Sequence, residues 1–496
     1  MNTKIIRYIL GHVLRIEAAF MLLPFIIGLY DHERLTFIFL FVALGAFLLS
    51  ILLTFKKPDD MVFYLKEGCV ATAASWLLMS VVGALPFCIS GTIPSFTDAL
   101  FETVSGFTTT GASILNEVES LPRCYLFWRC FTHWIGGMGV LVFLLAVVPL
   151  SGGSHINLMR AESPGPSVGK FVPKVRHTAR ILYIIYFVLT GIEVILLMCG
   201  GMGFLDSAMT SFGTAGTGGF GIRNDSFMSF TPYTQWVVAI FMIMFGMNFN
   251  IYYLLLFRQF KKAFAIEEIH YYLIIIVGAI AIIFFNIRTM FATPFEAMTH
   301  TVFQVSSIIS STGFSSADFN LWPNVCKVVL VILMFVGACA GSTGGGIKVT
   351  RLVVLIKTIG KELKNYIHPK RVSKVKMDGK PVEHEVVRAI NVFFITFMII
   401  FFTSILLISI ENYDFATNFS AVLATMNNIG PGLNLVGPTS NFSFFNNFSK
   451  YVLMFDMLAG RLELFPLLIL FHPGLYIDTI KSKHHRRKQR KSMSQD

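Results

Sequence analysis

Charged residues are scarce in this sequence. Only 14% of its 496 residues are charged, while 54% are hydrophobic and the mean hydropathy is +0.67. An ordinary soluble domain carries roughly 25% charged residues, so the composition excludes that class. Apolar runs of about 20 residues, the length needed to cross the hydrocarbon core of a bilayer, recur along the chain. The sequence therefore predicts an all-α, polytopic membrane protein.

The patterns that indicate enzymes, metal sites and disulfides are also missing. The seven cysteines contain no CxxC pair and mostly lie in apolar runs, which argues against a disulfide framework or a structural metal site. The glycine-rich residues 338–348 are not a nucleotide-binding P-loop, because Ile347 separates Gly346 from Lys348. Ionisable residues in the apolar runs are scattered rather than clustered. We therefore expect no enzyme activity and no organic cofactor on this chain.

Positive charge is concentrated where apolar runs end. The net charge of +12 comes largely from a lysine-rich segment at residues 357–380 and from the tail KSKHHRRKQRK at residues 481–491. Such flanks of membrane spans lie in the cytoplasm, and a basic tail can contact anionic lipid headgroups. We expect a multi-pass protein of the plasma membrane with both termini in the cytoplasm. A membrane location also makes nucleic acid an unexpected partner.

Four short, uncharged, glycine-containing turns recur between the apolar runs, and we call them the glycine turns. They are GFTTTGAS (106–113), TAGTGGFG (214–221), SSTGFSS (310–316) and NNIGPG (427–432). Each follows a short apolar, helix-like segment, at residues 100–104, 204–212, 295–309 and 415–426. Their spacing of about 100 residues suits two spans and a half-membrane loop, which indicates an internal fourfold duplication.

This pattern divides the chain into a helix pair, four repeats and polar connections. The N-terminal pair has apolar spans at about 14–30 and 35–54, and two spans per repeat bring the expected total to ten full spans with four re-entrant helices. The predicted units are the N-terminal pair (1–58), repeat one (59–150), a cytoplasmic linker (151–180), repeat two (181–262), repeat three (263–360), a basic cytoplasmic linker (361–385), repeat four (386–480) and a basic cytoplasmic tail (481–496).

Non-helical backbone inside a membrane is tolerated only where it is packed in protein or lines a watery path. Four glycine turns around one axis would present carbonyl oxygens to a central path, and rings of carbonyls make cation-selective filters. Glycine permits the positive φ angles that aim carbonyls inward. The candidate glycines are Gly111, Gly218, Gly313 and Gly430. The neighbouring candidates are Thr109, Thr110, Thr217, Ser311, Thr312, Asn428 and Ile429, of which the Thr and Ser residues could add hydroxyl oxygens.

Several motifs together with the glycine turns resemble the Trk/Ktr/HKT superfamily of potassium transporters, in its bacterial TrkH/TrkG branch. They are FWRCFTHWIGGMG (127–139), RAESPGP (160–166), AGSTGGGIK (340–348) and GRLELF (460–465). The resemblance covers nearly the whole chain. It implies a fourfold pseudosymmetric fold with an additional N-terminal helix pair, a homodimer, and potassium ions in a filter that contains the four candidate glycines. Plant relatives with Ser at the first of these positions transport sodium, so Gly111 favours potassium.

The resemblance also implies a gate and a partner. The gate would be an intramembrane loop below the filter, together with an arginine of the last span. The residues that match are Gly341, Ser342, Thr343, Gly344, Gly345, Gly346, Lys348 and Arg461. The partner would be a cytosolic TrkA-type subunit whose RCK domains bind NAD(H) or an adenine nucleotide. It would dock on the linkers at residues 151–180 and 361–385.

Four alternatives stay open at this stage. The chain could be a sodium-coupled potassium transporter of the Ktr branch, although the N-terminal pair argues against it. Arg461 could form a structural pair with Glu463 or Asp456, and Lys348 could extend to the inner interface of the membrane. Glu102 is predicted either to anchor the first glycine turn by hydrogen bonds or to set the electrostatic field at its entrance. His133 is interpreted as a packed polar group with hydrogen-bonding partners.

Overall fold

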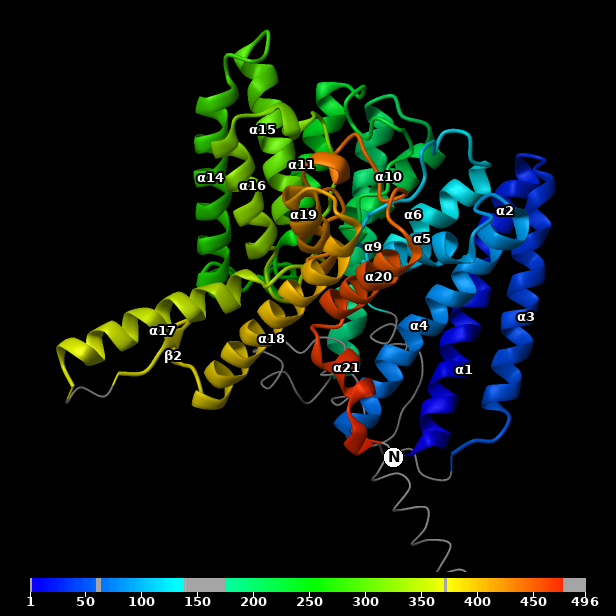
Figure 1. The fold of residues 1–496 in the computed structure, drawn as a ribbon, viewed down its shortest axis with the longest axis horizontal. Coiled ribbons are helices and arrows are strands. Elements are labelled where there is room, and N and C mark those ends of the chain that lie inside the picture. Colours follow the sequence, from blue (N-terminus) through cyan, green and yellow to red (C-terminus); the bar gives the residue numbers. More distant parts are fainter. Residues whose placement is uncertain (1, 59–63, 138, 140–174, 370–372, 476–496) are drawn as a thin grey trace, which may run out of the picture.

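The computed structural model describes residues 2–58, 64–137, 139, 175–369 and 373–475. The described chain is helical almost throughout (Figure 1), which confirms the predicted all-α class. Its only strands, within these ranges, are β1 (Lys376–Met377) and β2 (Lys380–Pro381), which pair as a short antiparallel hairpin. The predicted tail at 481–496 and the motif at 160–166 lie outside the described residues, as does most of the linker at 151–180.

The N-terminal pair packs at one side of the bundle (Figure 1). It comprises α1 (Thr3–Phe20), α2 (Leu22–Tyr30), η1 (Arg34–Thr36) and α3 (Phe37–Thr54). The first helix begins at Thr3, so the expected start near residue 14 was wrong. Arg15 does not end the span because its guanidinium donates to Ser50 Oγ (3.3 Å) and Thr54 Oγ1 (2.9 Å) of α3.

Each repeat has a long first helix and a short helix that leads into a glycine turn. The first helices are α4 (Leu65–Ser90), α9 (Val175–Cys199), α14 (Glu267–Ile287) and α18 (His384–Ile408). The lead-in helices are α5 (Phe96–Phe107), α10 (Phe204–Gly216), α15 (Pro294–Ile309) and α19 (Phe415–Met426). Several begin with a capping side chain, such as Ser95, Thr293 and Asp414, which fixes where the lead-in helix starts.

The second helix of each repeat follows the glycine turn. These helices are α6 (Arg123–Gly137), α11 (Pro232–Gly246) with α12 (Asn250–Leu256), α16 (Asn324–Val336) with α17 (Val349–Ile367), and α20 (Asn447–Arg461) with α21 (Phe465–Leu468). Short connecting elements are α13 (Phe260–Ala263), η3 (Phe319–Leu321), η4 (Ser409–Glu411), η5 (Asn434–Val436) and η6 (Ile469–Phe471).

The second helices of repeats two, three and four are each interrupted, which differs from an uninterrupted span. The described residues contain six helices long and apolar enough to cross a membrane, and one further pair, α11 and α12, is bent by 95°. In repeat three the break is a loop between Val336 and Val349, and in repeat four it lies between Arg461 and Phe465. The expectation of ten full spans stays a prediction, because residues 138 and 140–150, which belong to the expected second span of repeat one, lie outside the described residues. Broken helices at membrane depth line transport paths, so the breaks mark the region below the glycine turns.

Candidate ion-conducting site

The four glycine turns share one backbone conformation. In each, a left-handed residue is followed two positions later by a left-handed glycine. The pairs are Thr109 and Gly111 (φ 56° and 78°), Thr217 and Gly219 (54° and 81°), Ser311 and Gly313 (59° and 84°), and Asn428 and Gly430 (54° and 95°). The residue between them donates its N–H to a carbonyl five residues earlier in every repeat, at 2.8–2.9 Å. The sequence duplication is thus matched by a fourfold repeat of structure.

This register corrects one of the candidate glycines. Gly219, rather than Gly218, is equivalent to Gly111, because it has the positive φ two residues after the left-handed Thr217. Gly218 occupies the middle position of its turn, as Thr110, Thr312 and Ile429 do in theirs. Its lack of a side chain has a different reason, since a Cβ there would stand 2.2 Å from the ring of His133.

At the four left-handed glycines, each turn packs closely against the backbone of the next turn. A Cβ on Gly111 would stand 1.9 Å from the carbonyl oxygen of Gly218, and one on Gly313 would stand 1.9 Å from that of Ile429. The other two glycines face the next repeat in the same way. A Cβ on Gly219 would stand 2.0 Å from Thr312 O, and one on Gly430 would stand 2.8 Å from Thr110 O. The contacts run from repeat one to two, three, four and back to one. The turns therefore form a closed ring in which any side chain would displace a carbonyl.

Most side-chain oxygens of the glycine turns form hydrogen bonds within the protein. The hydroxyls of Thr110 and Thr312 bond to those of Thr108 and Ser310, at 2.8 and 2.7 Å. Thr217 donates to the carbonyl of Gly216 at 2.6 Å, whereas the buried Oγ1 of Thr109 has no hydrogen-bond partner among the described residues. The backbone carbonyls, more than the hydroxyls, are the ligands that this arrangement offers to a cation.

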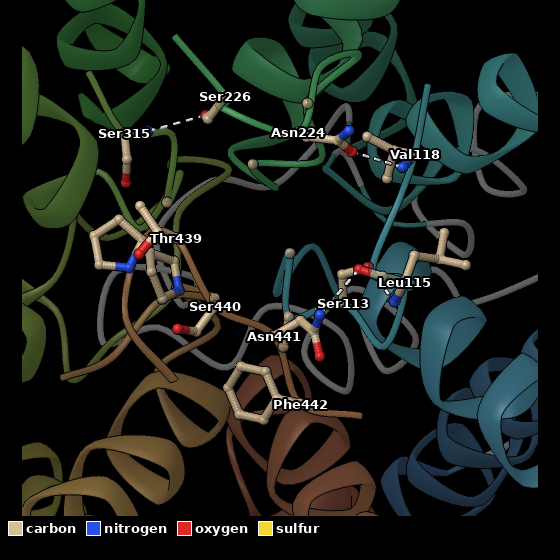
Figure 2. Close-up of a pocket in the computed structure, with 18 of the residues that line it drawn as sticks. Ser113, Leu115, Val118, Asn224, Ser226, Ser315, Thr439, Ser440, Asn441 and Phe442 are labelled. Atoms are coloured by element: carbon tan, nitrogen blue, oxygen red, sulfur yellow. Dashed lines mark hydrogen bonds between the residues drawn. The ribbon is translucent and has the colours of Figure 1, made fainter. Parts of the chain in front are cut away.

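A cavity lies directly outside the ring, and its walls are tied together across the repeats. Figure 2 shows segments of all four repeats around one open space, which is lined by Gly111, Gly219, Gly313 and Gly430 among others. The hydrogen bonds that join neighbouring repeats are Val118 N to Asn224 Oδ1 (2.8 Å), Ser315 N to Ser226 Oγ (3.1 Å), Asn434 N to Asn320 Oδ1 (3.0 Å) and Phe442 N to Ser113 O (2.8 Å). These four hydrogen bonds thus form a second closed set of contacts between the repeats, on the outer side of the ring.

Glu102 anchors the first turn by hydrogen bonds, one of its two predicted roles. Its buried carboxylate accepts from Ser113 Oγ (3.0 Å), Ile114 N (3.0 Å) and Arg129 Nε (2.6 Å). Arg129 in turn donates to the carbonyl of Gly221 at 3.0 Å, in the second turn. A buried ion pair of this kind fixes geometry only when its remaining groups are also bonded, as they are here. The pair joins repeats one and two beside the ring.

His133 joins the same two repeats from the inner side. Its Nε2 accepts from Phe220 N at 3.1 Å, and its Nδ1 lies 2.7 Å from the carbonyl oxygen of Gly106. Because Nε2 accepts, the proton sits on Nδ1 and is donated to Gly106. The imidazole therefore positions the end of α5 against the second turn, in agreement with the prediction of a packed histidine with partners.

Below the ring, residues 338–348 form a loop between α16 and α17, which we call the intramembrane loop. A Cβ on Gly344 would stand 2.6 Å from Ser310 O, and one on Gly345 would stand 2.2 Å from Asn427 O. The loop is joined to repeat two by Cys339 N to Gly246 O (3.0 Å), Phe249 N to Gly341 O (3.1 Å) and Thr343 Oγ1 to Phe245 O (3.3 Å). It therefore lies against the inner side of three repeats.

Arg461, from repeat four, connects this loop to repeat one. Its guanidinium donates to Thr343 O at 2.7 Å, to Gly137 O at 2.9 Å and to Gly136 O. The carboxylates considered as its structural partners have other contacts, since Glu463 bonds Arg351 and Asp456 accepts from Ser404. Arg461 thus places a positive charge beneath the ring, between repeats one and three.

The base of the loop is fixed by buried polar contacts. Lys348 has left-handed φ (82°), and its ammonium donates to the carbonyl of Gly344, so the predicted extension toward the inner interface was wrong. Ser342 Oγ donates to Cys339 O at 2.7 Å, and Gly341 and Gly346 have positive φ of 72° and 84°. These contacts close the loop on itself, and they keep the lysine charge at membrane depth beside a carbonyl dipole.

Sequence reasoning missed Glu268, which anchors the loop from α14. Its buried carboxylate accepts from Ala340 N (2.6 Å) and Thr350 N (3.2 Å), on the two sides of the loop, and from Asn248 Nδ2 (3.3 Å) at the α11–α12 break. An acidic residue in the first turn of a helix is ordinary, so its sequence position gave no signal. Only the fold brings it beside the loop.

Comparison with known proteins agrees with this architecture. The family model described as "TrkH: Cation transport protein" matches residues 34–479. The chain is 35% identical over 420 residues to the Trk system potassium uptake protein TrkH of Escherichia coli K12, covering 83% of this chain and 86% of that protein. It is 34% identical over 488 residues to the TrkH of Salmonella typhimurium, covering 96% of this chain and 100% of that protein.

A solved structure matches over almost the same length. The crystal structure of the potassium transporter TrkH from Vibrio parahaemolyticus superposes with a TM-score of 0.87 at 30% identity, covering 96% of this chain and 99% of that one. The predicted fourfold arrangement with its N-terminal helix pair is confirmed by this match. With the family model matching most of its length, the chain belongs to the TrkH family of cation transport proteins.

Proposed function

We propose that this protein takes up potassium across the plasma membrane through the ring formed by the four glycine turns. The observation that carries the proposal is the closed ring itself, in which each left-handed glycine packs against a carbonyl of the next repeat. Carbonyl oxygens can replace the hydration shell of a potassium ion. The matched relatives in Escherichia coli and Salmonella are named potassium uptake proteins, which supports the same ion.

The proposed ligands are the backbone oxygens at the four turns, with potassium bound on the central axis. The lead-in helices α5, α10, α15 and α19 each end at a glycine turn, so their negative C-terminal dipoles stabilise a cation there. A sodium-coupled mechanism of the Ktr type is not favoured, because the relatives quoted above are Trk proteins.

The intramembrane loop and Arg461 are the proposed gate. The loop contacts the inner side of the glycine turns, and Arg461 bridges it to repeat one. A cation leaving the ring toward the inner side would meet both the loop backbone and a fixed positive charge. Opening then requires the loop to move away from Ser310 and Asn427, whose carbonyls it now faces.

The proposal includes a homodimer in the membrane and a cytosolic TrkA-type subunit whose RCK domains bind NAD(H) or an adenine nucleotide. That subunit would dock on the linkers at residues 151–180 and 361–385. The second linker is described in part and carries the β1–β2 hairpin, which contacts the start of α14 through Asp378 and Glu267 N (2.8 Å). Transport rather than enzyme activity is proposed because the relatives quoted above are named as transport proteins.

The test is uptake of radioactive rubidium into proteoliposomes that contain the purified protein, with excess potassium or sodium as competitor. Uptake blocked by potassium and unaffected by sodium would support the proposal. If the protein alone shows no uptake, a TrkA-type subunit with nucleotide is added. Absence of uptake in both conditions, or equal competition by sodium, would overturn the proposal.

A further inference from the structure

We propose that Ser311 of the third glycine turn holds the intramembrane loop in place, and so positions the gate from within the filter. This inference rests on the proposed function of the loop. The backbone N–H of Gly345 donates to Ser311 Oγ at 2.5 Å, and both residues are buried. One residue therefore belongs to the ring through its backbone and to the gate through its side chain.

The contact lies where the loop and the ring pack most closely. Gly344 and Gly345 face the carbonyls of Ser310 and Asn427 so closely that neither has room for a Cβ. A Gly345 N–H in this position cannot reach water, and Ser311 supplies its acceptor. An N–H buried without an acceptor destabilises the state that buries it. The hydroxyl of Ser311 therefore favours the conformation in which the loop lies against the ring.

The equivalent residues of the other repeats have no such contact. Thr217 donates to the carbonyl of Gly216 in its own turn. Asn428 donates to Thr110 Oγ1 and to Met457 O, at 2.9 Å each. Thr109 Oγ1 has no hydrogen-bond partner among the described residues. Four residues share one backbone conformation, but only the side chain of Ser311 accepts from the loop, so the link is a feature of repeat three rather than of the ring.

The test combines two variants with two readouts. Ser311→Ala removes the acceptor and keeps the small size, whereas Ser311→Thr keeps a hydroxyl and matches the residue type of repeats one and two. The first readout is rubidium flux in proteoliposomes. The second is alkylation of the native Cys339, followed by mass spectrometry of its peptide. Cys339 lies in the loop and is fully buried, with its N–H bonded to Gly246 O, so its reaction reports movement of the loop.

For Ser311→Ala we expect about tenfold faster alkylation of Cys339 and a rise in flux, the order of effect that loss of one buried hydrogen bond produces. Ser311→Thr is expected to restore the wild-type alkylation rate. Thr217→Ala is the matched control for alkylation, because it removes a hydroxyl at the equivalent position of repeat two; its Cys339 rate is expected to equal that of the wild type.

The outcomes separate this inference from the proposed function. Cys339 alkylation equal in Ser311→Ala, Thr217→Ala and wild type would overturn the inference, even if the wild type transports potassium. An increase confined to Ser311→Ala would support the inference, even if uptake assays failed. An equal increase in both alanine variants would also contradict it, because it would mean that any disturbed turn releases the loop.

Discussion

The ring of glycine turns and the intramembrane loop below it are built on opposite principles. Every repeat contributes the same backbone conformation to the ring, with its left-handed pair and its glycine against the next carbonyl. The loop comes from repeat three alone, and the other repeats contact it unequally: repeat two through three hydrogen bonds, one of them to Gly246 O, and repeat four through the guanidinium of Arg461. The outer region is symmetric and the inner region is not.

This difference matches two physical requirements. A site that distinguishes ions by carbonyl oxygens needs those oxygens at equal distance from one axis, which repetition supplies. A gate needs one element that can move without disturbing the site above it. The loop is rich in glycine and held by individual hydrogen bonds, whereas the ring is held by close backbone packing and by buried ties such as Glu102 with Arg129. Variants can test whether rigidity and mobility are divided in this way.

The largest effect is expected when a buried tie of the ring is broken. Glu102→Gln keeps the size of the side chain but leaves the Arg129 cation without its carboxylate. Removing one partner of a buried pair costs roughly 3–5 kcal/mol, so the thermal unfolding midpoint in detergent should fall and the potassium preference should weaken. Glu362→Gln is the control, because its pair with Lys361 (3.4 Å) is more exposed. Equal midpoints for the two variants would contradict the anchoring role.

A side chain within the ring is expected to reduce selectivity. Gly111→Ser places a Cβ 1.9 Å from the carbonyl oxygen of Gly218 at a φ of 78°, so that carbonyl must move. A loss of about 1.4 kcal/mol in ion discrimination is a tenfold loss of preference, and we expect at least this for potassium over sodium. Competition between the two ions in rubidium uptake measures it. Unchanged preference in a folded variant would exclude Gly111 from the filter.

Removal of charge below the ring is expected to raise flux without changing selectivity. Arg461→Ala deletes both a positive barrier and the bridge from Thr343 to Gly137, so we expect flux to rise by several-fold. Arg461→Lys keeps the charge but cannot span the same carbonyls, and should give an intermediate flux. A folded alanine variant with flux equal to or below the wild type would contradict the gate assignment.

The smallest effect is expected at the outer cavity. Among its lining residues in the described chain are two arginines and no carboxylate, and Arg129 is already paired with Glu102. Arg223 is exposed and lies 4.4 Å over the ring of Phe230. Arg223→Gln should improve the apparent potassium affinity about twofold at low ionic strength, an effect that screening by salt should abolish. Arg288→Gln, also exposed and over a phenylalanine ring, is the control and should have no effect.

Much of the outer region could be predicted from the sequence, because a glycine turn after an apolar helix is a weak pattern alone but a recognisable one when it recurs four times. The predicted lead-in helices at 204–212, 295–309 and 415–426 agree closely with α10, α15 and α19. The lead-in helix of repeat one, predicted at 100–104, is longer in the structure, since α5 spans Phe96–Phe107. In the second turn the sequence prediction named Gly218, although Gly219 is adjacent to it. Only the backbone shows that Gly219 has the positive φ and that Gly218 makes room for His133.

The inner region was less predictable because its contacts join distant segments. The breaks after Gly246 and Arg461 lie in apolar sequence that resembles an uninterrupted span. Glu268 and Ser311 reach the loop only through the fold, at sequence separations of 72 and 34 residues from their partners. No local pattern distinguishes these residues from ordinary capping and turn residues.

The central claim is that a cation binds on the axis of the four glycine turns. Thallium mimics potassium and scatters X-rays anomalously, so a crystal of the protein grown with thallium locates the ion directly. We predict anomalous density inside the ring formed by the carbonyls of Thr110, Gly218, Thr312 and Ile429. Thallium bound elsewhere in the protein, with no density in this ring, would contradict the account.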